Sequence, residues 1–159
     1  MESRRCLIAG RQEAELDQRI TMITLGVADL ARATAFYKAL GWTCANDDAD
    51  EGIAFFNVQN SVFALYPWKG VAEEFGQTEE EFGRPNAMLA YNVKAKEEVA
   101  PILAEAVAAG GTIAKPAQDV FWGGHSGYFR DPDGHYWEVA WNPFSPLGPN
   151  GEARIGGWS

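Results

Sequence analysis

The clearest pattern along the chain is an alternation of apolar and polar residues that gives way to helical spacing. Over residues 22–27 every second residue is a branched aliphatic one, and this alternation predicts a strand. Over residues 30–40 the apolar residues follow the spacing of an amphipathic helix. Asp29 is a suitable N-cap for that helix, and Gly41 lies where a C-terminal glycine is expected. The segment therefore predicts a strand followed directly by a helix.

The same order of elements recurs in the second half of the chain. Residues 88–93 alternate again, residues 99–106 carry a helical stripe, and Gly110 and Gly111 end it. Pro101 lies inside this stripe, and unless the helix starts later we expect it to remove a backbone hydrogen bond and to bend the first turns. The two halves share little sequence identity, so the repeat is one of pattern. It predicts two copies of one structural unit.

Short strand patterns, and not further helices, follow each predicted helix. They cover residues 43–45, 52–58 and 61–67 in the first copy, and 112–114, 126–130 and 135–141 in the second. The segment Asp131-Pro132-Asp133-Gly134 between the last two fits a type I turn. We expect Asp131, Asp133 and the following His135 to serve this turn and not catalysis.

These elements predict an α+β fold in which two βαβββ modules form one domain, residues 19–143. The modules cover about residues 19–67 and 86–142, and residues 68–85 join them as a short helix and a loop. Residues 1–18 are expected to be an appendage, and residues 144–159, rich in proline and glycine, an irregular tail. Each module leaves one face of its sheet uncovered by its helix. The mixed sheets are therefore expected to line a shared cleft.

Composition narrows the class of protein. The chain has 159 residues, of which 47% are hydrophobic and 22% charged, as in an ordinary globular domain. No apolar run approaches the roughly 20 residues of a membrane span, and residues 1–18 contain no signal-peptide core. Cys6 and Cys44 form neither a CxxC motif nor a disulfide framework. We therefore expect a cytoplasmic protein with no membrane partner.

The charge of the chain restricts its partners. The formal net charge is -9, whereas nucleic-acid binding needs clustered lysine and arginine. We therefore expect no nucleic-acid partner. The charge is compatible with a cationic ligand, but solubility is the favoured explanation of it.

Two segments stand out, ITLGVADLARATAFYKALGW near the start of the first module and GYFRDPDGHYWEVAWNP at the end of the second. Together they resemble the vicinal oxygen chelate superfamily, which includes glyoxalase I, bleomycin resistance proteins and extradiol dioxygenases. The resemblance covers about residues 19–143 and implies the paired βαβββ fold that the repeat predicts independently. It also implies a small-molecule site between the modules and a homodimer.

The resemblance further assigns the positions at which enzymes of the superfamily bind one divalent metal ion. In this sequence those positions are Met22, Ala64, Met88 and Glu138. Only Glu138 suits a hard or borderline divalent ion, since a thioether is soft and alanine has no ligand atom. Catalytic metal sites usually have three protein ligands. We therefore expect the site to hold neither a metal nor another cofactor. The alternative hypothesis is a site that binds a divalent metal.

Glu138 and His125 are the candidates for acid–base chemistry. Glu138 lies between two apolar residues of its strand, so it faces the cleft if they face the core. If residues 131–134 form a four-residue hairpin loop, His125 pairs with Ala140 and lies diagonal to Glu138 on the same face. A shift of one residue sends His125 to the other face. The alternatives are a structural, hydrogen-bonded Glu138 and an ordinary loop histidine.

Aromatic residues are the candidates for the ligand-binding wall. Trp122 can stack on a planar or cationic ligand, or it can pack on the surface under the tail. Tyr66 alternates with Ala64 and is expected to face the cleft. The expected ligand-binding residues are Met22, Ala64, Tyr66, Met88, Trp122 and Tyr128.

Three functions fit these observations. The first, which the sequence favours, is a metal-free binding protein of the bleomycin-resistance type that holds a small aromatic or cationic molecule. The second is a lyase, isomerase or dioxygenase that uses a divalent metal. The third is a metal-free enzyme with Glu138 and His125 as acid and base. Glu138→Gln separates the first from the third, because it abolishes turnover only in an enzyme that needs this carboxylate.

Overall fold

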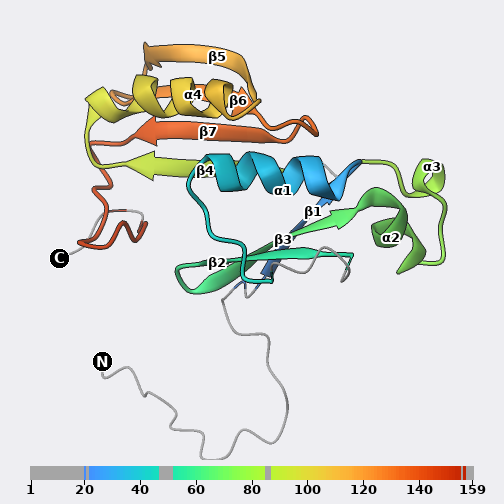
Figure 1. Cartoon of the computed structure of the whole chain (residues 1–159). Coiled ribbons are helices and arrows are strands. Elements are labelled where there is room, and N and C mark those ends of the chain that lie inside the picture. Colours follow the sequence, from blue (N-terminus) through green and yellow to red (C-terminus); the bar gives the residue numbers. More distant parts are fainter. Residues whose placement is uncertain (1–19, 21, 47–51, 85–86, 155, 157–159) are drawn as a thin grey trace, which may run out of the picture.

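The computed structural model describes residue 20 and residues 22–46, 52–84, 87–154 and 156. The predicted appendage, residues 1–18, lies outside the described residues. Figure 1 shows two sheets, one above the other, each built from one half of the chain.

The first module forms a three-stranded sheet. β1 (Met22–Val27) leads into α1 (Leu30–Ala39), and β2 (Ala54–Val58) and β3 (Ser61–Pro67) follow. The strand order is β1-β3-β2, with β1 parallel and β2 antiparallel to β3. The two outer strands of the sheet are therefore β1 and β2.

Local signals at both ends of α1 act as the sequence predicts. Asp29 Oδ1 accepts a hydrogen bond of 2.9 Å from the backbone N–H of Arg32. Gly41 has a φ of +90°, a conformation that strains other residues. The N–H of Trp42 then donates to the C=O of Tyr37 at 3.1 Å, which satisfies one of the last carbonyls of the helix. The glycine thus turns the chain and places Trp42 beside the helix end.

The second module forms a four-stranded sheet. Its elements are β4 (Met88–Val93), the 3₁₀ turn η2 (Lys96–Glu98), α4 (Val99–Ala108), β5 (Thr112–Asp119), β6 (His125–Arg130) and β7 (Tyr136–Trp141). The strand order is β4-β7-β6-β5. β4 is parallel to β7, and the other pairs are antiparallel. α4 packs on the sheet of its own module.

Two local predictions differ from the structure. Residues 43–45 form no strand, and Cys44 makes only an isolated bridge to Phe56. Pro101 lies in the first turn of α4, where the backbone N–H groups have no partner within the helix. The expected loss of a hydrogen bond therefore does not occur.

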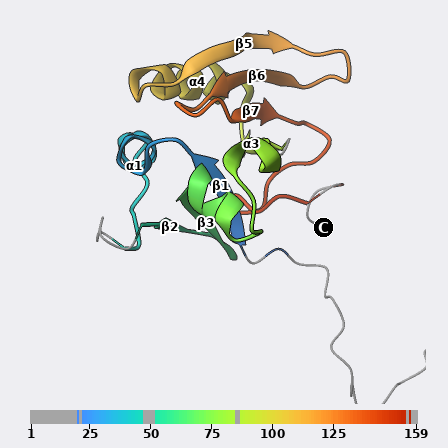
Figure 2. The ribbon, with the colours of Figure 1, turned by 90° about the vertical axis from the view of Figure 1, so that its right-hand side faces the viewer.

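The segments outside the modules are short and irregular. The joining segment contains two helices where one was predicted, α2 (Trp68–Glu73) and α3 (Glu79–Phe82), and Figure 2 shows both on the side that faces the viewer. The tail after β7 contacts both modules. The side chain of Gln59 donates to the C=O of Asn150 at 3.2 Å, and Lys94 donates to the C=O of Pro149 at 3.0 Å. The tail therefore ties the β2–β3 turn to the end of β4.

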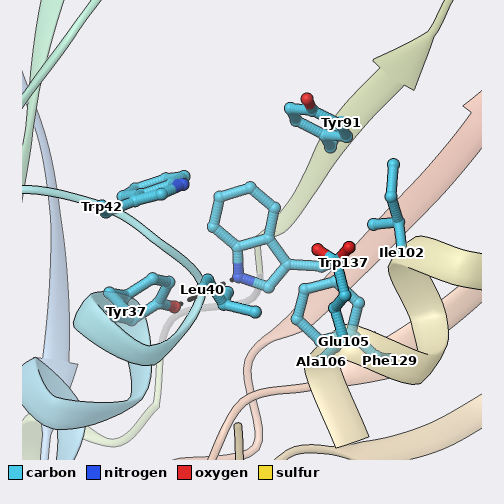
Figure 3. Close-up of a pocket in the computed structure, with 9 residues that line it drawn as sticks. All are labelled: Tyr37, Leu40, Trp42, Tyr91, Ile102, Glu105, Ala106, Phe129 and Trp137. Atoms are coloured by element: carbon cyan, nitrogen blue, oxygen red, sulfur yellow. Dashed lines mark hydrogen bonds between the residues drawn. The ribbon is translucent and has the colours of Figure 1, made fainter. Parts of the chain in front are cut away.

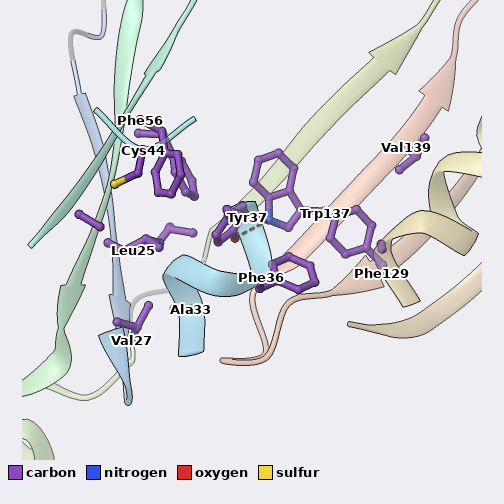
Figure 4. Packing of buried hydrophobic residues seen from close by; sticks show 14 of the residues in the cluster. Leu25, Val27, Ala33, Phe36, Tyr37, Cys44, Phe56, Phe129, Trp137 and Val139 are labelled. Carbon is purple, nitrogen blue, oxygen red and sulfur yellow. Dashed lines mark hydrogen bonds between the residues drawn. The ribbon is translucent and has the colours of Figure 1, made fainter. Parts of the chain in front are cut away.

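The two modules share one hydrophobic core (Figure 4). Tyr37 of α1 packs against Phe63 of β3, with ring centroids 4.9 Å apart, and its ring lies 6.2 Å from that of Trp137 of β7. Trp137 stacks on Phe129 with ring planes 3° apart. All four side chains are buried. Because α1 contacts both sheets, the modules cannot separate without exposing aromatic surface.

The Asp-Pro-Asp-Gly turn attaches the second module to the first. Tyr37 Oη donates to Asp131 Oδ2 at 2.7 Å, and both side chains are buried. The backbone N–H of Ala28 donates to Asp133 Oδ1, also at 2.7 Å. The turn residues therefore do more than form the turn, because they also fix the chain before α1 and the last turn of α1 against the end of β6.

His135 adds a third link to this attachment. Its Nε2 lies 2.7 Å from the C=O of Gly26 in β1, so this nitrogen carries the proton and donates it. Its ring lies 6.0 Å from the ring of Trp68, at the start of α2. His135 is thus half-buried between the modules.

The predicted α+β fold with two mixed sheets is confirmed. None of the described helices is long and apolar enough to cross a membrane.

Candidate functional site

Glu138 lies on the face of its sheet that points away from the core. It stands opposite Tyr128 of β6 and Ala90 of β4, while its neighbours Trp137 and Val139 are buried on the other face. Tyr128 Oη donates to Glu138 Oε1 at 3.0 Å. Partial burial raises the pKa of Tyr128, and the hydrogen bond to Glu138 and its negative charge raise that pKa further. The phenol therefore stays protonated and available as a donor.

His125 does not join Glu138, so the predicted pair is absent. The loop between β6 and β7 has five residues and not four, which places His125 opposite Trp141. Its side chain therefore lies on the opposite face of the sheet from Glu138. There, His125 Nδ1 is 2.8 Å from Asp119 Oδ1, and Lys96 Nζ approaches the same oxygen to 2.6 Å. Hydrogen bonds from Lys96 and His125 hold the pKa of the Asp119 carboxyl below its usual value.

The four positions that the sequence resemblance assigns to a metal do not fit a divalent ion. Met22 and Met88 are 46% and 56% exposed and offer only thioethers. Ala64 is buried and has no donor. Glu138 offers a carboxylate, and one of its oxygens accepts the Tyr128 hydrogen bond. In the part of the chain that the structure describes, no three His, Cys, Asp or Glu side chains are grouped to hold a metal ion.

Tyr66 and Trp122 both pack against glycines. Tyr66 shares a sheet face with Ala64, and its ring covers Gly70 of α2, where an added Cβ would lie 2.5 Å from the ring. Trp122, in the β5–β6 loop, covers Gly124 and is 37% exposed. The packing accounts for both side chains without a ligand.

A large groove lies between the two modules, and we call it the inter-module groove. Its volume is about 1030 Å³, which suits a drug-sized molecule. Residues of β1, β2 and β3 form one wall, and residues of β4 form the other. Its accessible aromatic side chains are Trp42 and Tyr91, and the buried rings of Phe56, Phe63 and Trp137 lie behind them in its lining.

The inter-module groove also has polar groups. Asn57, Gln59 and Asn60 line it from the β2–β3 hairpin, and Asn92 lines it from β4. None of the described residues that line it is charged. Part of the tail, residues 147–153, contributes to the wall through Leu147, Gly151 and Ala153.

The inter-module groove reaches the sheet face on which Glu138 lies. Met88, Ala90 and Asn92 share that face and line the groove, although Glu138, opposite Ala90, does not. Of the ligand-binding residues expected from sequence, Met88 is the one found among the described lining residues.

Comparison with known proteins identifies the family. The model of the Glyoxalase/Bleomycin resistance protein/Dioxygenase superfamily matches residues 19–139. The chain belongs to this superfamily. The resemblance found in the sequence is thereby confirmed. No curated protein matches the chain.

Several solved structures share the fold of this chain. A glyoxalase-related enzyme from Fulvimarina pelagi is 35% identical, with a TM-score of 0.77 over 87% of this chain and 98% of that one. The hypothetical protein SA1046 from S. aureus is 24% identical, with a TM-score of 0.67 over 80% and 96%. Lactoylglutathione lyase from Agrobacterium tumefaciens is 20% identical, with a TM-score of 0.60 over 80% and 96%. The last two, at these identities, show the fold alone.

Sequence reasoning missed the aromatic lining of the inter-module groove. The alternation in β4 assigns Tyr91 to the core face with Leu89 and Val93, yet Tyr91 is 49% exposed. Trp42 lies outside the helical stripe, directly after the glycine that ends α1. The available signal was the position of Trp42, because the glycine before it ends the helix and leaves its ring at the helix end, 5.3 Å from that of Tyr37.

Proposed function

We propose that this member of the glyoxalase superfamily binds a small organic molecule in the inter-module groove without a metal ion. The donor set at the four metal positions carries the proposal. Met22, Ala64 and Met88 leave one carboxylate, that of Glu138, where zinc or iron enzymes usually have three protein ligands. The groove supports the proposal with its volume and its aromatic lining.

The lining supports a ligand with a planar or apolar body and a few hydrogen-bonding groups. Accessible aromatic faces such as those of Trp42 and Tyr91 favour stacking. The carboxamides of Asn57, Asn60 and Asn92 offer both donors and acceptors. Because the described lining residues carry no charge, a charged group in the groove would lose its hydration without gaining a partner. The part of the ligand in the groove is therefore uncharged.

A metal-free enzyme is the second candidate, and one observation favours it. The hydrogen bond between Tyr128 and Glu138 places a protonated phenol beside a carboxylate, an arrangement that can position or accept a proton. His125 does not contribute, because it lies on the opposite face. Superfamily membership supports metal-dependent lyase, isomerase or dioxygenase chemistry. The four metal positions of this chain, however, lack the metal ligands that such chemistry needs.

A screen for ligands in the presence of a chelator tests the proposal. Demetallated protein is mixed with a library of small aromatic and heteroaromatic compounds, and stabilising compounds are found by thermal unfolding. We expect compounds that bind with EDTA present. Ala90→Trp places a large side chain in the groove at an exposed position and should weaken binding at least about tenfold, or 1.4 kcal/mol. Ala104→Trp, at an exposed position of α4 outside the groove, is the matched control.

The outcomes separate the candidates. Compounds that bind to Ala90→Trp as well as to the wild-type protein would contradict binding in the inter-module groove. Compounds that bind only when a metal ion is present would contradict metal independence. Glu138→Gln should leave the binding of a hit largely unchanged. Conversion of a hit by the wild-type protein that Glu138→Gln abolishes would instead establish the metal-free enzyme.

A further inference from the structure

A second hollow adjoins the inter-module groove and has a different chemistry (Figure 3). It has a volume of about 110 Å³ and lies between the C-terminal end of α1, α4 and β4. We call it the aromatic pocket. It shares Trp42, Tyr91 and Trp137 with the groove, so a ligand in the groove can extend a group into it.

Three aromatic side chains, Trp42, Tyr91 and Trp137, line both the aromatic pocket and the inter-module groove. The rings of Trp42 and Trp137 lie 5.9 Å apart with their planes at 81°. Figure 3 shows Tyr91 on the far side of Trp137 from Trp42. Trp137 is fixed from behind, because its Nε1 donates to Tyr37 Oη at 3.2 Å and its ring stacks on Phe129. Trp137 is therefore held in place before any ligand arrives.

One carboxylate lies at this pocket. Glu105 of α4 lines it, and no side-chain hydrogen bond or ion pair joins Glu105 to another of the described residues. None of the lining residues that the structure describes is a lysine, an arginine or a histidine. Aromatic faces carry negative electrostatic potential, so the rings and Glu105 attract the same kind of group.

We propose that the aromatic pocket binds an alkylammonium group of the ligand, whose uncharged body lies in the inter-module groove. This inference rests on the proposed function and names the ligand class. A cation over a tryptophan or tyrosine ring is attracted within about 6 Å of the ring centroid, and the attraction grows as water is excluded. The pocket holds roughly three or four water volumes, which suits a trimethylammonium group. An anion is repelled by Glu105.

A pair of probes of equal shape tests this assignment. Choline has a positively charged quaternary nitrogen where 3,3-dimethylbutan-1-ol has an uncharged quaternary carbon. Each is titrated at constant ionic strength, with sodium chloride as the blank, and binding is followed by tryptophan fluorescence and by NMR. We expect choline to bind about tenfold more tightly than the alcohol. Equal affinities would overturn the inference, because the pocket would then recognise only shape.

Matched variants locate the binding. Glu105→Gln and Tyr91→Leu should each weaken choline several-fold and leave the alcohol nearly unchanged. Glu97→Gln removes the same charge from the exposed η2 turn and should have no effect, which controls for net charge. Tyr91 is half exposed, so its replacement does not threaten folding. Choline binding that both Glu105→Gln and Tyr91→Leu leave intact would also overturn the assignment.

Failure of this inference is distinguishable from failure of the proposed function. If choline shows no preference while library compounds bind and are weakened by Ala90→Trp, the ammonium assignment falls and the groove stands. If choline binds as expected and no library compound binds in the groove, the aromatic pocket stands and the proposed function falls.

Discussion

Tyr37 shows how one side chain joins the two modules. Its Oη donates to Asp131 and accepts a hydrogen bond from Trp137 Nε1. Burial, followed by the negative charge of Asp131 and the hydrogen bond to it, raises the pKa of Tyr37 far above its usual value. The phenol is therefore a permanent donor to a buried carboxylate, and removing it leaves that carboxylate oxygen without a partner.

Tyr37→Phe tests the cost of that lost partner. We expect a loss of about 1–3 kcal/mol of unfolding free energy, because a buried acceptor becomes unsatisfied. Tyr136→Phe, at a tyrosine that is 44% exposed, is the control and should change stability by less than about 0.5 kcal/mol. Urea unfolding measures both. Equal, small losses in the two variants would show that Tyr37 does not hold the modules together through Asp131.

The titration of Tyr128 tests the Glu138 pair. Its pKa is raised in the folded state, so the associated stability is present below the unfolded tyrosine pKa and is lost as the pH rises through the folded value. Glu138→Gln should lower the pKa of Tyr128 part of the way, because partial burial remains. NMR of ring-labelled tyrosine measures the shift, with Glu105→Gln as the control. An unchanged Tyr128 titration in Glu138→Gln would contradict the hydrogen bond.

At the residue scale, alternation within one strand correctly predicts which side chains share a sheet face. It does not predict which side chains of two strands share a face when a loop joins them. It places Glu138 on the face away from Trp137 and Val139, as the structure does. It fails for His125, because the face of that residue depends on whether the β6–β7 loop has four or five residues. Asp131 and Asp133 were recognisable as turn formers, whereas their contacts with the first module join residues about a hundred positions apart.

At the element scale, the strands with a regular apolar pattern were predicted well, and the irregular edge strand β5 was not. β1, β3 and β4 have the bounds that their patterns of apolar residues predict. β5 extends five residues beyond its predicted end at Ala114, through Pro116. It tolerates the proline because it is an edge strand with an irregular register. Such irregularity leaves no periodic signal.

The close packing of α4 on β6 depends on a small residue. An added Cβ at Gly127 would lie 2.4 Å from Leu103 Cδ1 and 3.0 Å from backbone atoms of Lys115 and Ala117. We expect Gly127→Ala to lower the unfolding free energy by about 1–3 kcal/mol, because the interior has no room for the methyl group. Thermal or urea unfolding measures this.

A double-mutant cycle isolates the contact between these two elements. Leu103→Ala alone is destabilising, since Leu103 is buried. Combined with Gly127→Ala, it should cost less than the two losses added together, because the truncated side chain no longer meets the new methyl group. Strict additivity would show that the backbone contacts, and not Leu103, limit the space.

At the scale of the whole molecule, the inter-module groove was beyond the reach of the sequence. Its lining comes from both modules, from the loop after α1 and from the tail. Only the packing of the modules brings these segments together. The donor chemistry of Met22, Ala64, Met88 and Glu138, in contrast, depends on residue identity and was visible from the sequence.

A homodimer remains our prediction for the assembly. Phe121 is fully exposed and Phe144 is 68% exposed, and such apolar side chains are common in protein contacts. Light scattering after size exclusion should give twice the 17.4 kDa mass of the chain. Phe121→Ser with Phe144→Ser should weaken the dimer, whereas Phe75→Ser, at another exposed phenylalanine, should not. A monomer at all concentrations would contradict the prediction.

Metal independence is the central claim, and thermal unfolding of the demetallated protein tests it most directly. The melting temperature is measured with and without Mn²⁺, Fe²⁺, Co²⁺, Ni²⁺ and Zn²⁺. A native site filled at 100 times its Kd would add about 2.7 kcal/mol, which raises the melting temperature of a domain of this size by several degrees. We predict no saturable shift with any of these ions. A saturable rise that Glu138→Ala abolishes would contradict the account and restore a metal centre at this face.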